Sequence, residues 1–322
     1  MRILAAAGDG DPARVYLADL ATDGRERLVE FVESIQPPLP REEKWVLMVS
    51  TLLGCPVGCP MCDAGGSYHG RLSAAEIIRQ IDYLVDSRYP GRSIPAAKFK
   101  IQLARLGEPA YNPAVLDVLR ELPGRYDAPG LLPSLSTVAP RGCEAFFAEL
   151  AALKKRLYTG GRFQLQFSIH TTDPTLRDKL IPAPKCDFAW IARYAEEWFT
   201  PGDRLITLNF ALGADSPVEP SVLLEHFAPE RFLIKLTPLN PTYRARSHGL
   251  RSYLSHNPAA EDDALPRRLR EAGYRVIVSL GQSEEDLIGS NCGQFLQRHL
   301  KAREKLTDGY TRPVEHPTAD LG

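Results

Sequence analysis

Two kinds of apolar run alternate along the chain from residue 45 onward. Short runs rich in Val, Ile, Leu and Phe are typical of buried strands, and longer runs with helical spacing lie between them. The strand-like runs are 45–49, 98–103, 132–137, 163–169, 205–212, 232–236 and 274–279. The helix-like runs are 74–85, 113–122, 144–154, 188–198, 222–227 and 265–272. Strands that alternate with helices in this way predict a parallel sheet with crossover helices.

The first forty residues follow a different pattern. Residues 14–20 and 27–32 alternate apolar and polar positions on either side of Asp23-Gly24, which predicts a β-hairpin. A Pro-rich segment at 36–40 then interrupts the chain. The fold class that follows is α/β: a partial, six-fold α/β barrel with a short N-terminal β-hairpin. We expect a hairpin extension over 1–40, the barrel over 41–306 and a loose, polar tail over 307–322.

Charge and cysteine content narrow the class of protein. Among 322 residues, Lys and Arg number 39 and Asp and Glu 40, a net charge of −1. A protein that clamps a long nucleic acid normally shows a clear basic excess. Three of the six cysteines lie in one motif, which argues against a disulfide scaffold and favours a reducing, cytoplasmic location. No stretch approaches the ~20 apolar residues of a membrane span, and the apolar start of the chain is too short for a signal peptide.

The three clustered cysteines are the clearest chemical signal. Cys55, Cys59 and Cys62 follow the first barrel strand at C-x3-C-x2-C spacing. Soft thiolates packed this closely suit an iron–sulfur cluster or zinc. A 4Fe–4S cluster usually takes four cysteines, so three would leave one iron open to another ligand. Because no second cysteine pair recurs downstream, the spacing favours the cluster over zinc; plain loop thiols are the remaining alternative.

Polar residues also stand where later strands end. In a parallel barrel, the carboxyl ends of the strands carry the chemistry. A carboxylate, hydroxyls, an imidazole and an amide at these points suit a ligand with an amino-acid moiety and a ribose. The residues are Gly107, Glu108, Ser136, Ser168, His170 and Asn240. Ordinary capping and turn chemistry explains any one of them equally well, but their order at successive strand ends favours a binding site.

With these motifs in this order, the chain resembles the radical S-adenosylmethionine (SAM) superfamily. Within it, the chain is similar to the ribosomal RNA adenine methyl synthases of the RlmN/Cfr type, over roughly residues 14–294. Further matching stretches are 72–78, Arg177-Asp178, Asn240-Pro241 and Asn291-Cys292-Gly293-Gln294. The resemblance implies that SAM chelates the open iron and that Glu108 binds its ammonium group. By the same resemblance Gly107, Ser136, Ser168, His170 and Asn240 complete the SAM site.

Cys292 is the second informative cysteine. A lone cysteine is most often an inert, partly buried small residue. In the family that the chain resembles, the cysteine of this Cys-Gly-Gln motif is the methyl carrier. One SAM methylates it, a radical from a second SAM removes hydrogen from that methyl, and the carbon radical adds to an aromatic ring. The resemblance therefore implies a catalytic role for Cys292.

The chain departs from the family in three ways that bear on the substrate. Met48 stands where the family has the cysteine that resolves the covalent intermediate, and methionine cannot supply a thiolate. Cys143 and Cys186 are spare thiols. The chain begins almost at the hairpin, without the family's N-terminal RNA-binding extension, and its net charge is near zero. We therefore expect a small-molecule or non-ribosomal substrate, with RNA less favoured, and an external electron donor.

A basic stretch follows the sixth barrel strand. Arg244, Arg246, His248 and Arg251 lie within eight residues. The stretch is either a solvated loop or a clamp for an anionic substrate.

The sequence thus predicts a radical SAM enzyme of the methyltransferase type that acts through Cys292. Three alternatives remain: an RNA adenine methyl synthase, direct hydrogen abstraction without methylation, and a non-catalytic iron–sulfur protein.

Overall fold

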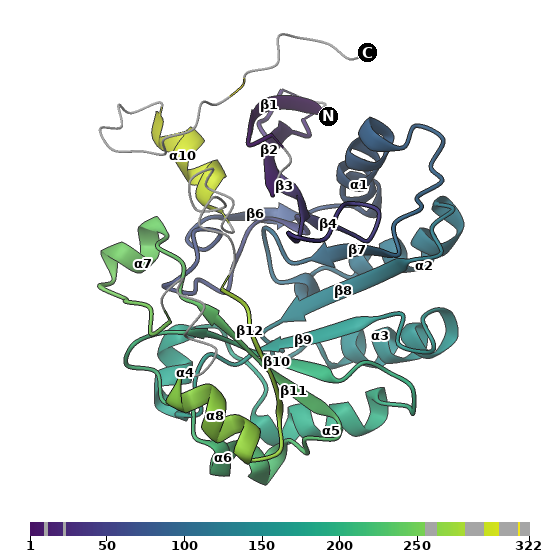
Figure 1. The fold of residues 1–322 in the computed structure, drawn as a ribbon. Coiled ribbons are helices and arrows are strands. Elements are labelled where there is room, and N and C mark those ends of the chain that lie inside the picture. Colours follow the sequence, from purple (N-terminus) through teal and green to yellow (C-terminus); the bar gives the residue numbers. More distant parts are fainter. Residues whose placement is uncertain (10–11, 22–23, 255–262, 281–292, 303–314, 316–322) are drawn as a thin grey trace. The chain divides into compact units, whose positions relative to one another are not determined.

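The computed structural model describes residues 1–9, 12–21, 24–254, 263–280, 293–302 and 315 (Figure 1). Its internal contacts divide the chain into two compact units, and each is built from separate stretches of sequence. The first unit comprises Met1–Pro56, Asp63–Pro133 and Ser283–Gly322. The second comprises Val57–Cys62 and Ser134–Gln282.

The first unit contains an antiparallel sheet that continues into parallel strands. Strands β1 (Arg2–Ala7), β2 (Ala13–Asp19), β3 (Leu28–Ile35) and β4 (Lys44–Val49) pair in antiparallel order, and β4 pairs in parallel with β7 (Lys98–Leu103). A small ribbon joins β5 (Leu52–Gly54) to β6 (Tyr68–Arg71). The predicted hairpin is confirmed by the β2–β3 pair, and β1 extends it by one strand that the pattern did not predict.

The helices of the first unit are α1 (Ala74–Arg88), η1 (Pro109–Tyr111), α2 (Ala114–Arg125) and α10 (Gln294–Ala302). Helix α1 begins with a capping box, in which Ser73 accepts from the backbone N–H of Glu76 and the Glu76 carboxylate accepts from that of Ser73. Along β4, Trp45, Leu47 and Val49 are buried, so Met48 lies on the other, partly exposed face.

A buried carboxylate ties the hairpin to α1. Glu33 on β3 is fully buried and accepts hydrogen bonds from Arg88 Nη2 at 2.7 Å and Arg41 Nη1 at 3.0 Å. The hydroxyl of Tyr16 on β2 donates to the same carboxylate at 3.1 Å. Several donors around one buried anion compensate for its lost hydration.

The second unit is a parallel α/β layer. Strand β8 (Leu131–Thr137) begins in the first unit and ends in the second, where it pairs with β9 (Gln164–Ser168). Strands β10 (Ile206–Leu212), β11 (Phe232–Pro238) and β12 (Arg275–Val278) continue the parallel order. The helices of this unit are α3 (Glu144–Leu157), α4 (Pro174–Leu180), α5 (Phe188–Trp198), α6 (Pro220–His226), α7 (Tyr243–Ser247) and α8 (Ala264–Glu271).

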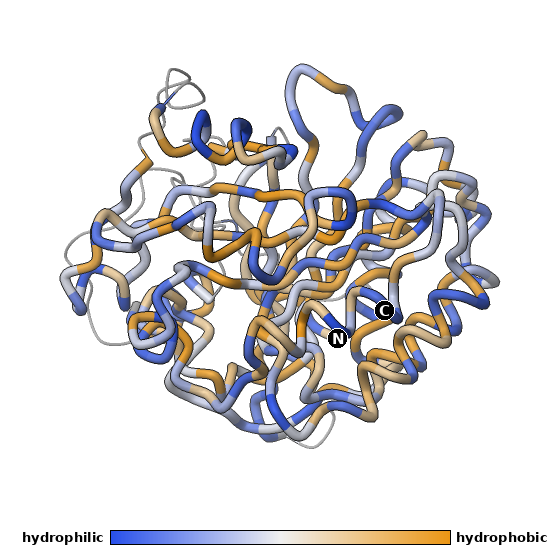
Figure 2. Tube along the Cα trace, turned by 90° about the horizontal axis from the view of Figure 1, so that it is seen from below, coloured by the Kyte–Doolittle hydropathy of each residue, from blue (hydrophilic) through white to orange (hydrophobic). Residues whose placement is uncertain are grey.

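Aromatic side chains pack α3 and α5 onto the sheet of the second unit. The Tyr194 ring of α5 lies 5.3 Å from the ring of Phe147 on α3 and 6.2 Å from that of Phe167 on β9, between centroids. Edge-on pairs of this kind contribute ~0.5–1.5 kcal/mol beyond the area they bury. Figure 2 shows the matching hydrophobic colouring along the strands and on parts of the helices.

All seven predicted barrel strands are present, and the α/β class is confirmed. The pattern missed β1, β5, β6, α4, α7 and α10, most of which are too short for a periodic signal. The predicted domain boundaries stay predictions, and of the tail over 307–322 only Glu315 is described. In the described part of the chain, no helix has both the length and the apolar character to cross a membrane.

Candidate active site

Cys55 belongs to the first unit and emerges from the β5–β6 ribbon. It follows Gly54, whose φ is +73° and whose absent Cβ would lie 1.6 Å from the carbonyl oxygen of Ser67. Cys55 forms a bridge with Gly65 beyond that ribbon. Only glycine fits at residue 54, so the sequence fixes the path of the chain just before the first thiol.

Cys59 and Cys62 belong to the second unit, in a segment that we call the thiol loop, Val57–Cys62. The backbone N–H of Cys62 donates to the carbonyl of Cys59 at 3.2 Å, and Gly58 has a φ of +75°. Both thiols are partly exposed and form no disulfide, as is also true of Cys55. Partly exposed thiols that form no disulfide fit the ligand chemistry of an iron–sulfur cluster. Among the described residues, no three His, Cys, Asp or Glu side chains are grouped to bind a metal ion, so the assignment rests on the spacing and state of these thiols.

The start of α7 holds the thiol loop in the second unit. Arg244 donates from Nη2 to the carbonyl of Gly58 at 3.1 Å and from Nε to that of Cys59 at 3.2 Å. The hydroxyl of Thr242 donates to the carbonyl of Met61 at 2.9 Å. We call this pair of side chains the guanidinium anchor. The sequence analysis predicted Arg244 only as part of a basic stretch, and the short helix α7 offered no signal for this contact.

In the first unit, Glu108 lies directly after Gly107 at the carboxyl end of β7. Gly107 has a φ of +100°, and a Cβ there would lie 2.4 Å from the side chain of Leu52. Glu108 is 4% exposed, and its Oε1 accepts from the backbone N–H of Ala110 at 3.0 Å as the cap of η1. The carboxylate is thus fixed in one orientation by its own turn. Both the binding and the capping interpretations of Glu108 agree with this geometry.

In the second unit, Ser136, Ser168 and His170 lie at the carboxyl ends of β8 and β9. Ser136 accepts from the Gln166 side chain at 3.1 Å, and Ser168 stands beside Asn209 of β10 in the parallel register. Asn240 follows the end of β11, and its carbonyl accepts from the backbone N–H of Thr242. The predicted residues of this unit therefore share one edge of its sheet.

His170 is the most constrained of these side chains. It is 7% exposed, has a φ of +68°, and its Nδ1 lies 3.0 Å from the backbone N of Ala211. Because Nδ1 accepts there, the proton of the neutral ring is on Nε2. Burial, and then the charge of Arg177, lowers the pKa of His170 from 6.5 to about 4. His170 is therefore a neutral hydrogen-bond donor at physiological pH.

Arg177, which the sequence placed in a matching motif, is itself buried. It is 5% exposed, donates from Nη1 to the carbonyl of Cys186 at 2.9 Å, and lies 5.0 Å over the Phe188 ring. Burial lowers the pKa of Arg177 to about 10. The spare thiol of Cys186 is buried in the same surroundings, where burial raises its pKa to about 11.

Cys292 lies outside the described residues, but Gly293, which follows it, is described. Gly293 has a φ of +82°, and a Cβ there would lie 2.1 Å from the backbone N of Ala64 and 2.3 Å from the carbonyl carbon of Asp63. Asp63 is the residue after Cys62. Gly293, the central residue of the Cys-Gly-Gln motif, therefore contacts Asp63 and Ala64, which follow the three-cysteine motif. Only glycine fits at this contact.

A buried carboxylate in the first unit fixes this contact, and the sequence did not predict it. Glu30 on β3 accepts from the backbone N–H of Gly293 and, at 2.9 Å, from that of Leu296. Its carboxylate also lies 2.8 Å from Nε of Arg105, and both side chains are nearly inaccessible. Burial raises the pKa of Glu30, while Arg105 and the two N–H groups oppose the shift. We call this group the carboxylate anchor.

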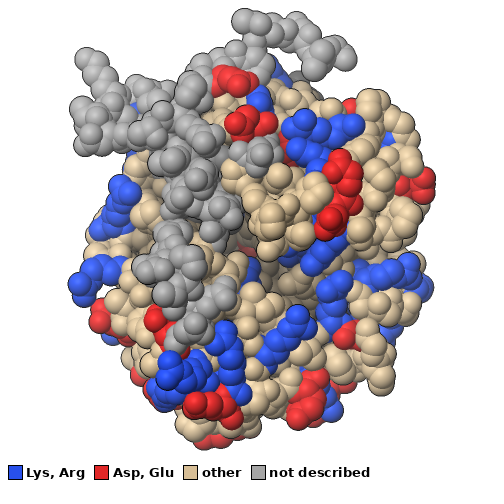
Figure 3. Space-filling view, viewed as in Figure 1, with Lys and Arg blue, Asp and Glu red and all other residues tan. Residues whose placement is uncertain are grey.

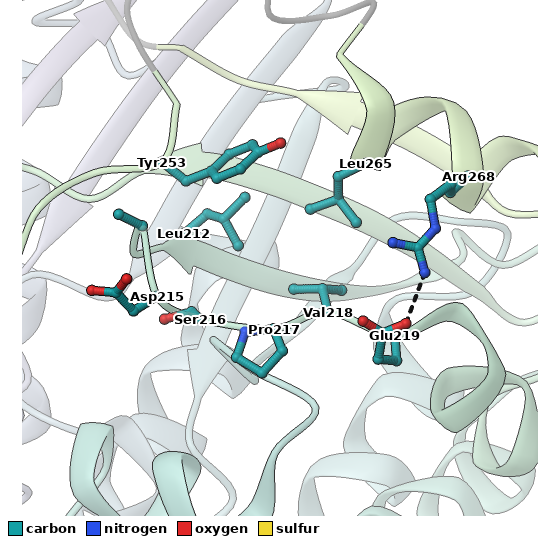
Figure 4. Close-up of a pocket in the computed structure, with 10 residues that line it drawn as sticks. Leu212, Asp215, Ser216, Pro217, Val218, Glu219, Tyr253, Leu265 and Arg268 are labelled. Carbon is teal, nitrogen blue, oxygen red and sulfur yellow. Dashed lines mark hydrogen bonds and ion pairs between the residues drawn. The ribbon is translucent and has the colours of Figure 1, made fainter.

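A separate cavity in the second unit contains none of the predicted residues. Its volume is about 350 Å³, and it lies beyond the end of β10. Leu212, Val218 and Leu265 form apolar walls, Tyr253 lies across one side, and Arg268 pairs with Glu219 at the rim (Figure 4). Asp215 and Ser216 also line the cavity, so its lining is both polar and apolar.

Comparison with known proteins places this geometry in context. No family model matches the chain. It is 30% identical over 282 residues to a dual-specificity RNA methyltransferase RlmN of Thermobifida fusca, covering 82% of this chain and 70% of that protein. The RlmN proteins of Salinispora tropica and Frankia alni are 27% and 29% identical, and the matches cover 69% and 59% of their lengths.

A solved structure shows the same fold. The radical SAM methyltransferase from Sphaerobacter thermophilus matches 91% of this chain and 81% of its own, with a TM-score of 0.67 and 21% identity. This likeness confirms the predicted fold class, an α/β chain of the partial-barrel type. The identity to the RlmN protein of Thermobifida fusca shows the family, and with it that the molecule is an enzyme of the methyltransferase type: the chain belongs to the RlmN family of methyltransferases.

Proposed function

We propose that this enzyme binds a 4Fe–4S cluster through Cys55, Cys59 and Cys62, and binds SAM beside it. It then methylates a small or non-ribosomal substrate, with Cys292 as the methyl carrier. When bound, the cluster would supply the electron that cleaves SAM. An external electron donor would then reduce the cluster again. Such chemistry needs reduced thiols, which favours the cytoplasm.

The observation that carries the proposal is the contact of Gly293 with Asp63 and Ala64. Gly293 is the residue that follows Cys292 in the sequence, and Asp63 is the residue that follows Cys62. The carboxylate anchor fixes Gly293 and Leu296 after the carrier, at the start of α10. A segment that is fixed from Gly293 onward supports a role for the cysteine that precedes it.

Some of the predicted residues would bind SAM through an ionic contact, and the others would bind it through hydrogen bonds. In the first unit, Glu108 would accept from the ammonium group, and Gly107 would let the backbone approach closely. In the second unit, neutral His170 would donate from Nε2, and Ser136, Ser168 and Asn240 would offer hydroxyl and amide groups. Because His170 stays neutral, its ring adds no positive charge next to the sulfonium.

An anionic substrate is supported by the basic stretch after β11. Arg244 donates hydrogen bonds to the thiol loop, whereas Arg246, His248 and Arg251 are exposed to solvent. Three cationic or titratable groups within six residues suit a carboxylate or a phosphate. On the face shown in Figure 3 the two signs of charge are mixed, in keeping with the net charge of −1.

RNA is the second candidate substrate, because the relatives named above are RNA methyltransferases. The two candidates differ in the salt dependence of binding. Contacts to several phosphates make affinity fall steeply as salt rises. Binding to RNA fragments, measured at low and at physiological salt, would support this candidate if it is present and steep, and remove it if absent at both.

Reconstitution of the cluster tests the proposed function. We expect wild-type protein to acquire the absorbance of a 4Fe–4S cluster and to cleave SAM when reduced, and Cys59→Ala to lose both. Cys143→Ala is the matched control, because this thiol lies outside the motif. A Cys59→Ala protein that keeps a full cluster and cleaves SAM would show that the assignment is wrong.

A further inference from the structure

We propose that Thr242 and Arg244 are positioning residues for the thiol loop, and that the charge of Arg244 raises the reduction potential of the cluster bound there. The inference rests on the proposed function, since it concerns the cluster that Cys59 and Cys62 would bind. It assigns Arg244 a task other than the binding of an anionic substrate.

Two side chains donate hydrogen bonds to three backbone carbonyl groups of the thiol loop. Arg244 reaches the adjacent carbonyls of Gly58 and Cys59 from two nitrogens of its planar fork, and Thr242 reaches that of Met61. One carbonyl belongs to Cys59. The other two belong to the residue before Cys59 and to the residue before Cys62. A fork that binds neighbouring carbonyls restrains both peptide planes, which a single point donor cannot do.

Thr242 links this restraint to the helix itself. Its hydroxyl accepts from the backbone N–H of Ala245 at 3.0 Å, as the cap of α7, while it donates to Met61. One hydroxyl therefore fixes both the start of the helix and the loop. On the other side, the position where a Cβ of Gly58 would stand has no atom of the described residues within 4 Å, so their packing does not restrain the loop there.

The guanidinium also brings a fixed positive charge to the loop. Reduction adds an electron to a cluster, and a nearby cation stabilises the more negative state. Arg244 is held at the peptide carbonyl of Cys59, so its charge moves with that ligand. Arg246, two residues on, is exposed and carries the same charge without these bonds, which makes it the matched control.

Two measurements on Arg244→Gln, Arg244→Lys and Arg246→Gln test the proposal. The first is hydrogen–deuterium exchange of a peptide covering residues 57–62 in the cluster-free protein. Loss of the two hydrogen bonds to the loop should speed exchange about tenfold in Arg244→Gln. Thr242→Val should also speed exchange, and Thr242→Ser should not.

The second measurement is the midpoint potential of the reconstituted cluster. In Arg244→Gln we expect about tenfold less reduced cluster at a fixed donor potential, a shift of about 59 mV for one electron. Arg244→Lys should keep the potential but not the slow exchange. If Arg244→Gln matches Arg246→Gln in either measurement, the proposal is overturned. A wild-type protein without a cluster contradicts the proposed function instead, and exchange in the loop still decides whether Thr242 and Arg244 position it.

Discussion

The carboxylate anchor of the first unit and the guanidinium anchor of the second hold their loops by opposite means. In the first, the buried carboxylate of Glu30 accepts from the backbone N–H groups of Gly293 and Leu296 and pairs with the buried Arg105. In the second, the partly exposed cation of Arg244 donates to backbone carbonyls next to Cys59. A charge in a dry site is expensive to leave without its partner, whereas one in contact with water is not. The first anchor should therefore control stability, and the second should adjust a loop without supporting the fold.

Removal of Glu30 should give the largest effect on stability. Glu30→Ala leaves Arg105 buried without its carboxylate and should lower the free energy of unfolding by about 3–5 kcal/mol. Glu30→Gln should cost less, because the amide oxygen still accepts and burial already disfavours the charged carboxylate. Urea unfolding of the three proteins is the measurement. A loss below about 1 kcal/mol in Glu30→Ala would remove the contrast between the two anchors.

The next effect comes from His170 and appears as a dependence on pH. Its pKa is about 4 when folded and 6.5 as a free side chain, so the unfolded chain binds more protons between these values. The contribution of His170 is present above pH 6.5 and is lost as pH falls toward 4, by up to about 3 kcal/mol. His170→Asn, which tolerates a positive φ, should flatten that part of the pH profile. Identical profiles for both proteins between pH of about 7 and about 4.5 would contradict the burial of a neutral ring.

Within the first unit, Glu30 is expected to affect stability, whereas Glu108 is expected to affect the binding of SAM. Glu108→Ala should weaken SAM binding by ~1.5–3 kcal/mol, or roughly tenfold to a hundredfold, and leave the cluster loaded. Titration of the reconstituted protein with SAM gives the affinity, and iron analysis gives the loading. Unchanged affinity would mean that Glu108 only caps η1.

The smallest effect on stability is expected at Arg244. Arg244→Gln should change the free energy of unfolding by no more than about 1 kcal/mol, because its guanidinium is partly exposed to water. Urea unfolding beside Arg246→Gln provides the comparison. A loss as large as that of Glu30→Ala would show that both anchors support the fold.

Much of the fold could be predicted from the sequence, because the apolar residues of its strands and helices recur in strong, regular patterns. The seven barrel strands and the hairpin follow from such patterns, and the thiol spacing follows from the motif alone. Glu30 and Glu33 were missed because carboxylates are rarely fully buried unless paired. Both are fully buried here, and each is paired with an arginine from a distant segment, a contact that no local pattern reveals. Arg244 read as part of a basic stretch, since no local pattern reveals a contact with residues some 185 positions earlier.

The carrier role of Cys292 is the central claim, and its consequences depend on Met48. Met48 lies on β4 beside Val32 and Gln102, and it cannot release a covalent intermediate as a thiol would. If the family's mechanism otherwise holds, a methylene bridge from Cys292 to substrate should persist, and Met48→Cys should speed its release.

Mass spectrometry of the protein made in the presence of SAM tests that claim most directly. The account predicts that the peptide containing Cys292 is heavier than the unmodified peptide by one methylene unit in wild type and in Met48→Cys, and that Cys292→Ala carries no such mass and does not turn over. A Cys292 that is never methylated, together with normal turnover by Cys292→Ala, would contradict the account. Direct hydrogen abstraction from substrate would then explain the enzyme better.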